Sequence, residues 1–570
     1  MKVYYHKGDK WRSIPARLPS EQNMLALSFN NWDDYGISTT LNAILYFDGE
    51  PFLDFSLKLL IENDKYSPMK LNELCDNGWD GFFPLPNLNY ISVPSDIDFY
   101  STLIAKIGTE STKVVLELIR DAGYLKNILG DENAIRLTES VDFSTSPLRE
   151  AGARKAYKDG WMLFDDKISS IQDFTLNIFN KDGTKEPVHF HFNSEQLPYD
   201  INVLIGPNGI GKSFTLKSLV EYWLGVDSGN KDSLEEKGHI PFDIYPNISK
   251  LILISYSPFE EFTLDLSKAR LMDKEAYKYF GFRKARINTD GDQRIGISRN
   301  LPASDSVHSI LKALSDDKKF SFMPSWKNKF DTILSVLRPA IGCDLIAFEL
   351  SENIGSLESI PGFPSYFNSE NKRYMPINES VYKMLENWHG TIEECINFQA
   401  GAVFIRDGQK VEISSGQRLF CYIVVNVVGQ IRKDSLVVID EPELFLHPTF
   451  EIEFIALLKK VLKAFNSKAI LATHSLAITR EIPAKCIHVY HKRNEKIEIE
   501  QPPFETFGGD MQRISSYVFG DSSTSKPYDV WIEEKINEHK NPEELIRLLG
   551  NELNEELLIK ILNAGAGNGN

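Results

Sequence analysis

Cysteine is scarce in this sequence and does not occur in a metal-binding pattern. The 570 residues contain five cysteines, at positions 75, 343, 395, 421 and 486, all far apart and without a CxxC pair. An odd number at this spacing argues against a disulfide framework and against a zinc site.

Long apolar runs are also lacking. No stretch reaches the length of a transmembrane helix, and the N-terminal MKVYYHKGDKW does not contain the apolar core of a signal peptide. We therefore expect a cytoplasmic protein that does not contact a membrane.

Positive charge is in deficit, since the formal net charge is −17. This opposes non-specific binding of nucleic acid by the chain as a whole, so such binding would need a local basic patch. Residues 268–299 are the one candidate, because basic residues there outnumber acidic ones and alternate with Tyr277, Tyr279, Phe280 and Phe282. They fit either a nucleic-acid surface centred on Arg283, Lys284 and Arg286 or a solvated face over core aromatics.

Two smaller patterns resemble metal sites, but we prefer a structural explanation for each. The pair Asp96 and Asp98 resembles a metal-binding DxD, but an exposed loop is the better interpretation. His189 and His191 share one face of an expected strand, where polar positions are more common than a zinc pair.

A phosphate-binding loop is the strongest motif present. The apolar run 201–205 predicts a buried strand, and a helix is expected over 214–224. Between them, the sequence fits G-x-x-x-x-G-K-[ST], with these residues: Gly206, Pro207, Asn208, Gly209, Ile210, Gly211, Lys212, Ser213 and, next in the helix, Phe214. Glycines let successive N–H groups face phosphate oxygens, Lys212 would reach the β- and γ-phosphates, and Ser213 would bind Mg²⁺.

Two further apolar strands end in polar residues. The segment SLVVIDE (435–441) predicts a buried strand that ends in Asp440 and Glu441, and LATHS (471–475) places His474 after another strand. An acid at such a strand end can hold Mg²⁺ through water, and the next acid can polarise an attacking water. His474 could hydrogen-bond a γ-phosphate.

Taken in order, the phosphate loop, ISSGQ (413–417), LVVIDEPELFLHP (436–448) and LATHS resemble the ATPase head of the ABC superfamily. The resemblance is greatest to the branch of SMC, RecF-like and phage-defence ATPases. It covers about 170 to 500, and the insertion within it is too long for a transporter subunit.

The resemblance implies roles for individual residues. Lys212 and Ser213 belong to Walker A, Asp440 is the Walker B acid that holds Mg²⁺, Glu441 is the catalytic base, and His474 is the switch histidine. Ser414, Ser415, Gly416 and Gln417 match the signature, which in this superfamily completes the ATP site of a second protomer. The resemblance thus implies ATP and Mg²⁺ as cofactors, ATPase activity and a homodimer.

The sequence departs from the superfamily pattern at two positions. Ser415 stands where the signature has glycine, and no glutamine occurs near Ser257, where a metal-contacting glutamine is expected.

His447 lies in the stretch that follows Walker B.

The expected fold is α/β, an ABC-type ATPase head with a mixed sheet and a RecA-like core. We predict an N-terminal α+β region over 1–165, with a helix over 101–122, and the first part of the head over 166–256. A mainly helical insertion over 257–405, the second part of the head over 406–500 and a helical C-terminal tail over 501–570 would follow.

The overall layout is similar to the PtuA family, the ATPases of Septu antiphage systems and of some retrons. That family pairs the ATPase with a small HNH nuclease and, in retrons, with a reverse transcriptase and RNA-linked DNA. The resemblance implies a regulatory ATPase of an antiviral complex, whose cleavage activity comes from a partner because this chain has no nuclease motif. The alternative is a RecF- or SMC-like ATPase of DNA repair.

Overall fold

In the computed structural model, the following residues are described: 1–7, 23–34, 36–165, 170–180, 183–264, 276–287, 293–323, 326–351, 367–369, 372–387, 395–444, 446–493, 496–520, 527–539, 542–553 and 555–567. They form two compact units, Met1–Gly508 and Gly509–Asn570.

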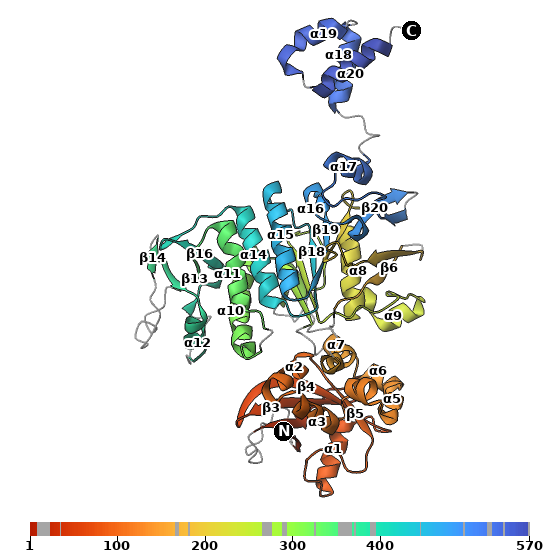
Figure 1. Ribbon diagram of the computed structural model, residues 1–570, viewed down its shortest axis with the longest axis vertical. Helices are drawn as coiled ribbons and strands as arrows, with labels where there is room; N and C mark the ends of the chain where they lie inside the picture. The colour runs from red at the N-terminus through yellow and green to blue at the C-terminus, as the bar shows by residue number, and fades with distance from the viewer. Residues whose placement is uncertain are drawn as a thin grey trace. The chain divides into compact units, whose positions relative to one another are not determined.

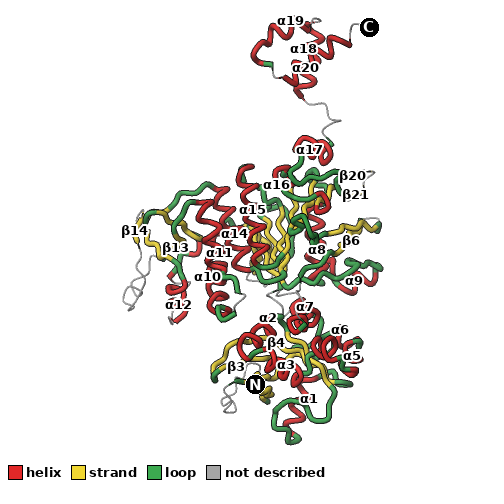
Figure 2. Tube along the Cα trace, viewed as in Figure 1, coloured by secondary structure: helices red, strands yellow, loops and turns green. Residues whose placement is uncertain are grey.

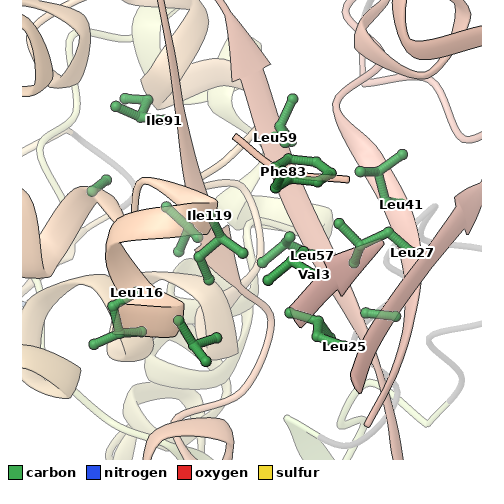
Figure 3. Packing of buried hydrophobic residues seen from close by; sticks show 14 of the residues in the cluster. Val3, Leu25, Leu27, Leu41, Leu57, Leu59, Phe83, Ile91, Leu116 and Ile119 are labelled. Carbon is green, nitrogen blue, oxygen red and sulfur yellow. The ribbon is translucent and has the colours of Figure 1, made fainter. Parts of the chain in front are cut away.

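The N-terminal part of the first unit is a five-stranded sheet with helices. The strands follow in chain order across the sheet and are β1 (Lys2–His6), β2 (Met24–Phe29), β3 (Thr40–Phe47), β4 (Glu50–Ile61) and β5 (Tyr90–Pro94). The helices are α1 (Ser67–Asp76), α2 (Asp98–Ile107), α3 (Thr109–Ile119), α4 (Ala122–Tyr124), α5 (Glu132–Thr138), α6 (Val141–Thr145) and α7 (Ala151–Asp159). Leu25, Leu57 and Phe83 from the sheet side pack with Leu116 and Ile119 of α3 (Figure 3), so this part has its own apolar core.

The helix expected over 101–122 is two helices. Gly108 separates α2 from α3 with φ 78°, a conformation that glycine adopts without a steric cost. The apolar spacing on both sides was recognisable, but the break depends on one glycine.

A seven-stranded sheet forms the centre of the first unit. Its order is β10-β9-β18-β19-β8-β20-β21, and all neighbouring strands are parallel except β20 and β21. The strands are β8 (Ile201–Ile205), β9 (Lys250–Ser255), β10 (Tyr277–Gly281), β18 (Ser435–Asp440), β19 (Lys468–Thr473), β20 (Ile487–Arg493) and β21 (Lys496–Glu500). This is the predicted mixed α/β sheet of an ATPase head.

Helices cover both faces of this sheet, with α8 and α15 on opposite sides (Figure 1). Leu436, Val438 and Leu204 belong to the apolar cluster of α8, which also takes in the hairpin of β6 and β7. The remaining elements of the head are β6 (Phe174–Phe179), β7 (Lys185–Phe190), α8 (Lys212–Leu224), α9 (Lys231–Glu236), α14 (Ser415–Gln430), α15 (Pro448–Ala464) and α16 (Leu476–Arg480).

The insertion differs from the mainly helical segment that we expected over 257–405. Besides β10, it contains β11 (Arg283–Ile287), β12 (Gln293–Ile297), β13 (Leu345–Glu349), β14 (Phe367–Ser369), β15 (Lys372–Pro376) and β16 (Ala402–Arg406). Its helices are α10 (Leu301–Phe320), α11 (Lys329–Ile341) and α12 (Glu379–Asn387). A second five-stranded sheet combines β13 to β16 with β17 (Gln409–Lys410). Runs such as LIAFE and AVFIR are only five residues long, which suits strands and not helices.

The two parts of the first unit are joined by one buried ion pair and one that is partly exposed. Lys155 of α7 contacts both Asp159 and, at 2.9 Å, Asp434, and all three side chains are almost completely buried. Arg432 donates to Asp96 at 2.7 Å. The DxD pair therefore lies against a cation of the head and is not part of a free loop.

The second unit consists of helices, drawn as red tubes in Figure 2. They are α17 (Met511–Phe519), α18 (Pro527–His539), α19 (Pro542–Leu549) and α20 (Glu555–Gly567). Ile532, Leu545 and Ile561 form a small apolar core. In the described part of the chain, we find no helix with the length and apolarity needed to cross a bilayer.

Candidate nucleotide site

The phosphate loop lies where the parallel strand β8 ends and α8 begins. All five residues of β8 are buried, and α8 starts at Lys212, two residues earlier than predicted. Gly209 and Gly211 have φ of 70° and 113°, and a Cβ on Gly211 would lie 2.8 Å from Ile497 Cδ1. The glycine pattern therefore matches a backbone that side chains would disturb.

Lys212 points back over the loop that precedes it. Its Nζ donates to the carbonyl oxygens of Gly206 and Pro207 at 3.0 and 3.1 Å and lies 2.9 Å from Nε2 of His474. The predicted Walker A lysine and switch histidine are thus in direct contact, although 262 residues separate them.

Ser213 and Asp440 also meet, as the Walker A and Walker B assignments require. The Ser213 hydroxyl donates to Asp440 Oδ1 at 3.0 Å, and the Ser255 hydroxyl donates to Asp440 Oδ2 at 3.3 Å. Ser255 ends β9, which neighbours β18 with Ser255 opposite Asp440. Its contribution was missed because it depends on strand register, and no local motif signals it.

Glu441 and His474 face one another beside this pair. Their side chains approach to 3.7 Å, from Glu441 Oε1 to His474 Nε2. Glu441 has φ 50°, and its N–H donates to the Ala472 carbonyl at 2.8 Å. The two predicted catalytic residues therefore lie at the carboxyl ends of the adjacent parallel strands β18 and β19.

Burial sets the protonation of the site. It raises the pKa of the Asp440 carboxyl to about 7, since desolvation and the nearby acids Glu260 and Glu441 outweigh the bonds from Ser213 and Ser255. Burial also lowers the pKa of the Lys212 ammonium to about 8, although the nearby carboxylates act to raise it.

Burial, and after it the charge of Lys212, lowers the pKa of His474 to about 4. The imidazole is therefore neutral at pH 7, and its Nε2 accepts a hydrogen bond from Lys212.

The donor set fits a nucleotide with Mg²⁺. Mg²⁺ prefers oxygen ligands and keeps several waters, and a hydroxyl with one adjoining carboxylate, Ser213 with Asp440, supplies such a partial shell. No cluster of three or more His, Cys, Asp or Glu side chains suited to a metal occurs among the described residues. Backbone N–H groups at the α8 N-terminus would hold phosphate oxygens.

The predicted signature begins α14, whose N-cap is Ser414. No hydrogen bond or ion pair joins residues 414–417 to residues 206–214, all of which are described. Ser414 caps the helix and forms a capping box with Gln417, and both Ser414 and Ser415 are exposed.

The other end of α14 is fixed by cations. Lys329 Nζ donates to the Gly429 carbonyl at 3.2 Å, and Lys250 Nζ donates to Gln430 Oε1 at 3.0 Å. Cations are favourable at a helix C-terminus because of the helix dipole.

The histidines outside the site have local structural roles. His447 is the N-cap of α15 and accepts a bond from the Thr449 N–H at 3.4 Å. His189 and His191 bond to Thr175 and Asp173, in agreement with the preferred polar-strand interpretation.

The expected nucleic-acid patch is corrected in part. Tyr277 and Phe280 lie in the core of the main sheet, where bases cannot stack on them. Arg283 is mostly buried and bonds to the Glu260 carbonyl oxygen and to Glu261. Lys284 is exposed, and the side chain of Arg286 lies outside the described residues. The sequence shows basic residues next to aromatic ones because the core strand β10 is followed directly by the polar hairpin of β11 and β12.

Comparisons with known proteins agree with an ATPase. Residues 239–480 match the family model "AAA domain, putative AbiEii toxin, Type IV TA system". Protein ea59 of Escherichia phage lambda is 23% identical over 553 residues, which cover 94% of this chain and 93% of that protein.

Solved structures with some likeness include ATPase heads. The SMC head domain from Thermotoga maritima has a TM-score of 0.26 and 11% identity, over 59% of this chain and all of that one. The cbiO1 protein of Clostridium perfringens, part of an ABC transporter complex, has a TM-score of 0.26 and 13% identity, over 67% of this chain and 99% of that one. Over residues 239–480, which include Asp440, Glu441 and His474, the chain is thus similar to an AAA-type ATPase domain.

Proposed function

We propose that the chain binds ATP with Mg²⁺ and hydrolyses it. The observation that carries this proposal is that five predicted residues contact one another in pairs after the ends of three strands. Lys212 lies 2.9 Å from His474, Ser213 lies 3.0 Å from Asp440, and Glu441 lies 3.7 Å from His474. Glu441 would accept a proton from an attacking water, and Lys212 with the loop N–H groups would hold the phosphates. Mg²⁺ held by Ser213 and Asp440 would neutralise phosphate charge.

Lys212 and Glu441 test different steps of this function. Lys212→Ala should abolish measurable ATP binding, whereas Glu441→Gln should bind ATP but turn it over at least ~100-fold more slowly. Binding of a fluorescent ATP analogue and phosphate release measure the two. Lys217→Ala on α8 and the exposed Glu453→Gln on α15 are matched controls. Wild-type turnover by Glu441→Gln would contradict the assignment of the base.

We further propose a homodimer in which Ser414, Ser415, Gly416 and Gln417 of one protomer complete the ATP site of the other. The exposure of Ser414 and Ser415, neither of which bonds to residues 206–214, supports this. Glu441→Gln should therefore dimerise when ATP is added. Size-exclusion chromatography with light scattering measures the change, and a monomer at saturating ATP would contradict it.

At the level of the cell, we propose a regulatory ATPase of an antiphage complex that controls a separate HNH nuclease. The toxin–antitoxin description of the matching family supports this setting over DNA repair. A reverse transcriptase with RNA-linked DNA would join the complex in a retron.

Affinity purification from the native locus tests this proposal. Co-purification of a small HNH protein, with or without a reverse transcriptase and RNA-linked DNA, would support it. Recovery of the ATPase alone would favour a repair enzyme, for which DNA should stimulate ATP hydrolysis.

A further inference from the structure

Two carboxylates to which the sequence analysis gave no role hold the loop that carries His474. Glu443, in the turn after Walker B, accepts a hydrogen bond from the His474 backbone N–H at 2.5 Å through Oε1. Glu451, on the first turn of α15, accepts one from the Ser475 hydroxyl. The two residues thus hold adjacent positions of the same loop.

Glu443 is half-buried. Its Oε2 is inaccessible to solvent and has no hydrogen-bond partner in the described part of the chain. Burial raises the pKa of this carboxyl, against the opposing bonds from His474 and Thr473. A buried polar atom without a partner costs free energy, so a glutamate is unfavourable here unless its bonds to His474 and Thr473 compensate.

The contact ties together two loops whose spacing matters for the chemistry. Glu443 follows Glu441 by two residues, and His474 lies 3.7 Å from Glu441 and 2.9 Å from Lys212. A fixed His474 backbone therefore fixes the distance from the imidazole to the base and to the ammonium.

We propose that Glu443 is a positioning residue that holds His474 in place against Glu441 and Lys212, with Glu451 securing the next residue. This inference rests on the proposed ATPase function and adds a residue that acts through His474.

Steady-state ATP hydrolysis and ATP binding by the full chain test the proposal. Glu443→Ala should lower kcat by between about 10- and 100-fold, the range expected for a misplaced catalytic group, with the Kd for ATP unchanged. Glu443→Gln keeps an oxygen acceptor for the His474 N–H and should restore kcat to within about threefold of wild type.

A double-mutant cycle with His474→Ala separates positioning from general stabilisation. If Glu443 acts through His474, Glu443→Ala should lower kcat no further in the His474→Ala background. An equal fold-loss in both backgrounds, or no rescue by glutamine, would overturn the proposal.

The buried carboxylate Asp317, which caps α11 in the insertion, provides the matched control. Asp317→Ala should lower the unfolding temperature. Its kcat, calculated from the concentration of ATP-binding sites measured by titration, should not change. A wild-type chain without ATP turnover would overturn the proposed function itself. Turnover that Glu443→Ala leaves unchanged would overturn only the inference.

Discussion

At the scale of residues, the backbone of Glu441 separates two adjacent carboxylates. Its φ of 50° lies in the left-handed region, which is unusual for a residue other than glycine. The chain therefore turns between Asp440, which accepts from Ser213, and Glu441, which faces His474. Such strain commonly occurs at functional sites, and it gives two neighbouring acids different partners.

His488 makes the stability of the chain sensitive to acid. This histidine of β20 is buried, its Nε2 lies 3.2 Å from Asn202 Oδ1, and burial lowers its pKa to about 3. Below the unfolded pKa of about 6.5 the unfolded state binds the extra proton. The free energy of unfolding should thus fall by up to ~1.4 kcal/mol per pH unit from about 6.5 toward 3.

Urea unfolding at several pH values measures this effect. His488→Gln should flatten the dependence by about one proton. The exposed His447→Asn, which keeps a capping oxygen, should not flatten it. An equal acid sensitivity in wild type and His488→Gln would show that other groups account for it.

The sequence predicted residues of the site when their chemistry is local. Lys212 and Ser213 occupy fixed places in a short motif, and Asp440 and Glu441 follow one apolar run. Ser255 and Glu443 were not predicted, because each acts on a residue of another strand or loop. Strand register sets those contacts, and nothing in the neighbouring sequence encodes it.

At the scale of elements, the close contact of α10 with α14 depends on a glycine. A Cβ on Gly429 would lie 2.4 Å from the backbone oxygen of Ser309, so the two helices would have to separate. We expect Gly429→Ala to cost about 1–3 kcal/mol, as overpacking does. In a helix without a close neighbour, Gly→Ala would instead stabilise by about 1 kcal/mol. A lower denaturation midpoint for Gly429→Ala would therefore support the close contact, and a higher midpoint would contradict it.

Elements were predicted best where the pattern is long or sharply bounded. The strand 201–205 and the helix that follows it were found, whereas the insertion was expected to be mainly helical. Its strands β13 and β16 are short apolar runs far apart in the chain, and they pair directly with each other. Periodicity does not reveal such a partner.

At the scale of the whole molecule, Lys155 connects the N-terminal part to the ATPase domain. Its ammonium lies between the carboxylates of Asp159 and Asp434, and all three side chains are buried. Removing one partner of a buried ion pair costs about 3–5 kcal/mol, so Lys155→Met should lower the free energy of unfolding of the first unit by that amount.

Calorimetry of the full chain measures this prediction. Lys158→Met, an exposed lysine one turn along α7, is the matched control. Equal unfolding profiles for Lys155→Met and the wild type would show that the two parts are stable without this link.

Helix α14 connects the exposed signature residues with the contact to the N-terminal part. It is 16 residues long, or about 24 Å at the usual rise. Its exposed end carries Ser415, and its buried end is fixed by Lys329 and Lys250. Two residues beyond it, Arg432 binds Asp96. A rigid-body movement of α14 would therefore shift Arg432 relative to Asp96, and the contact between them does not involve the phosphate loop.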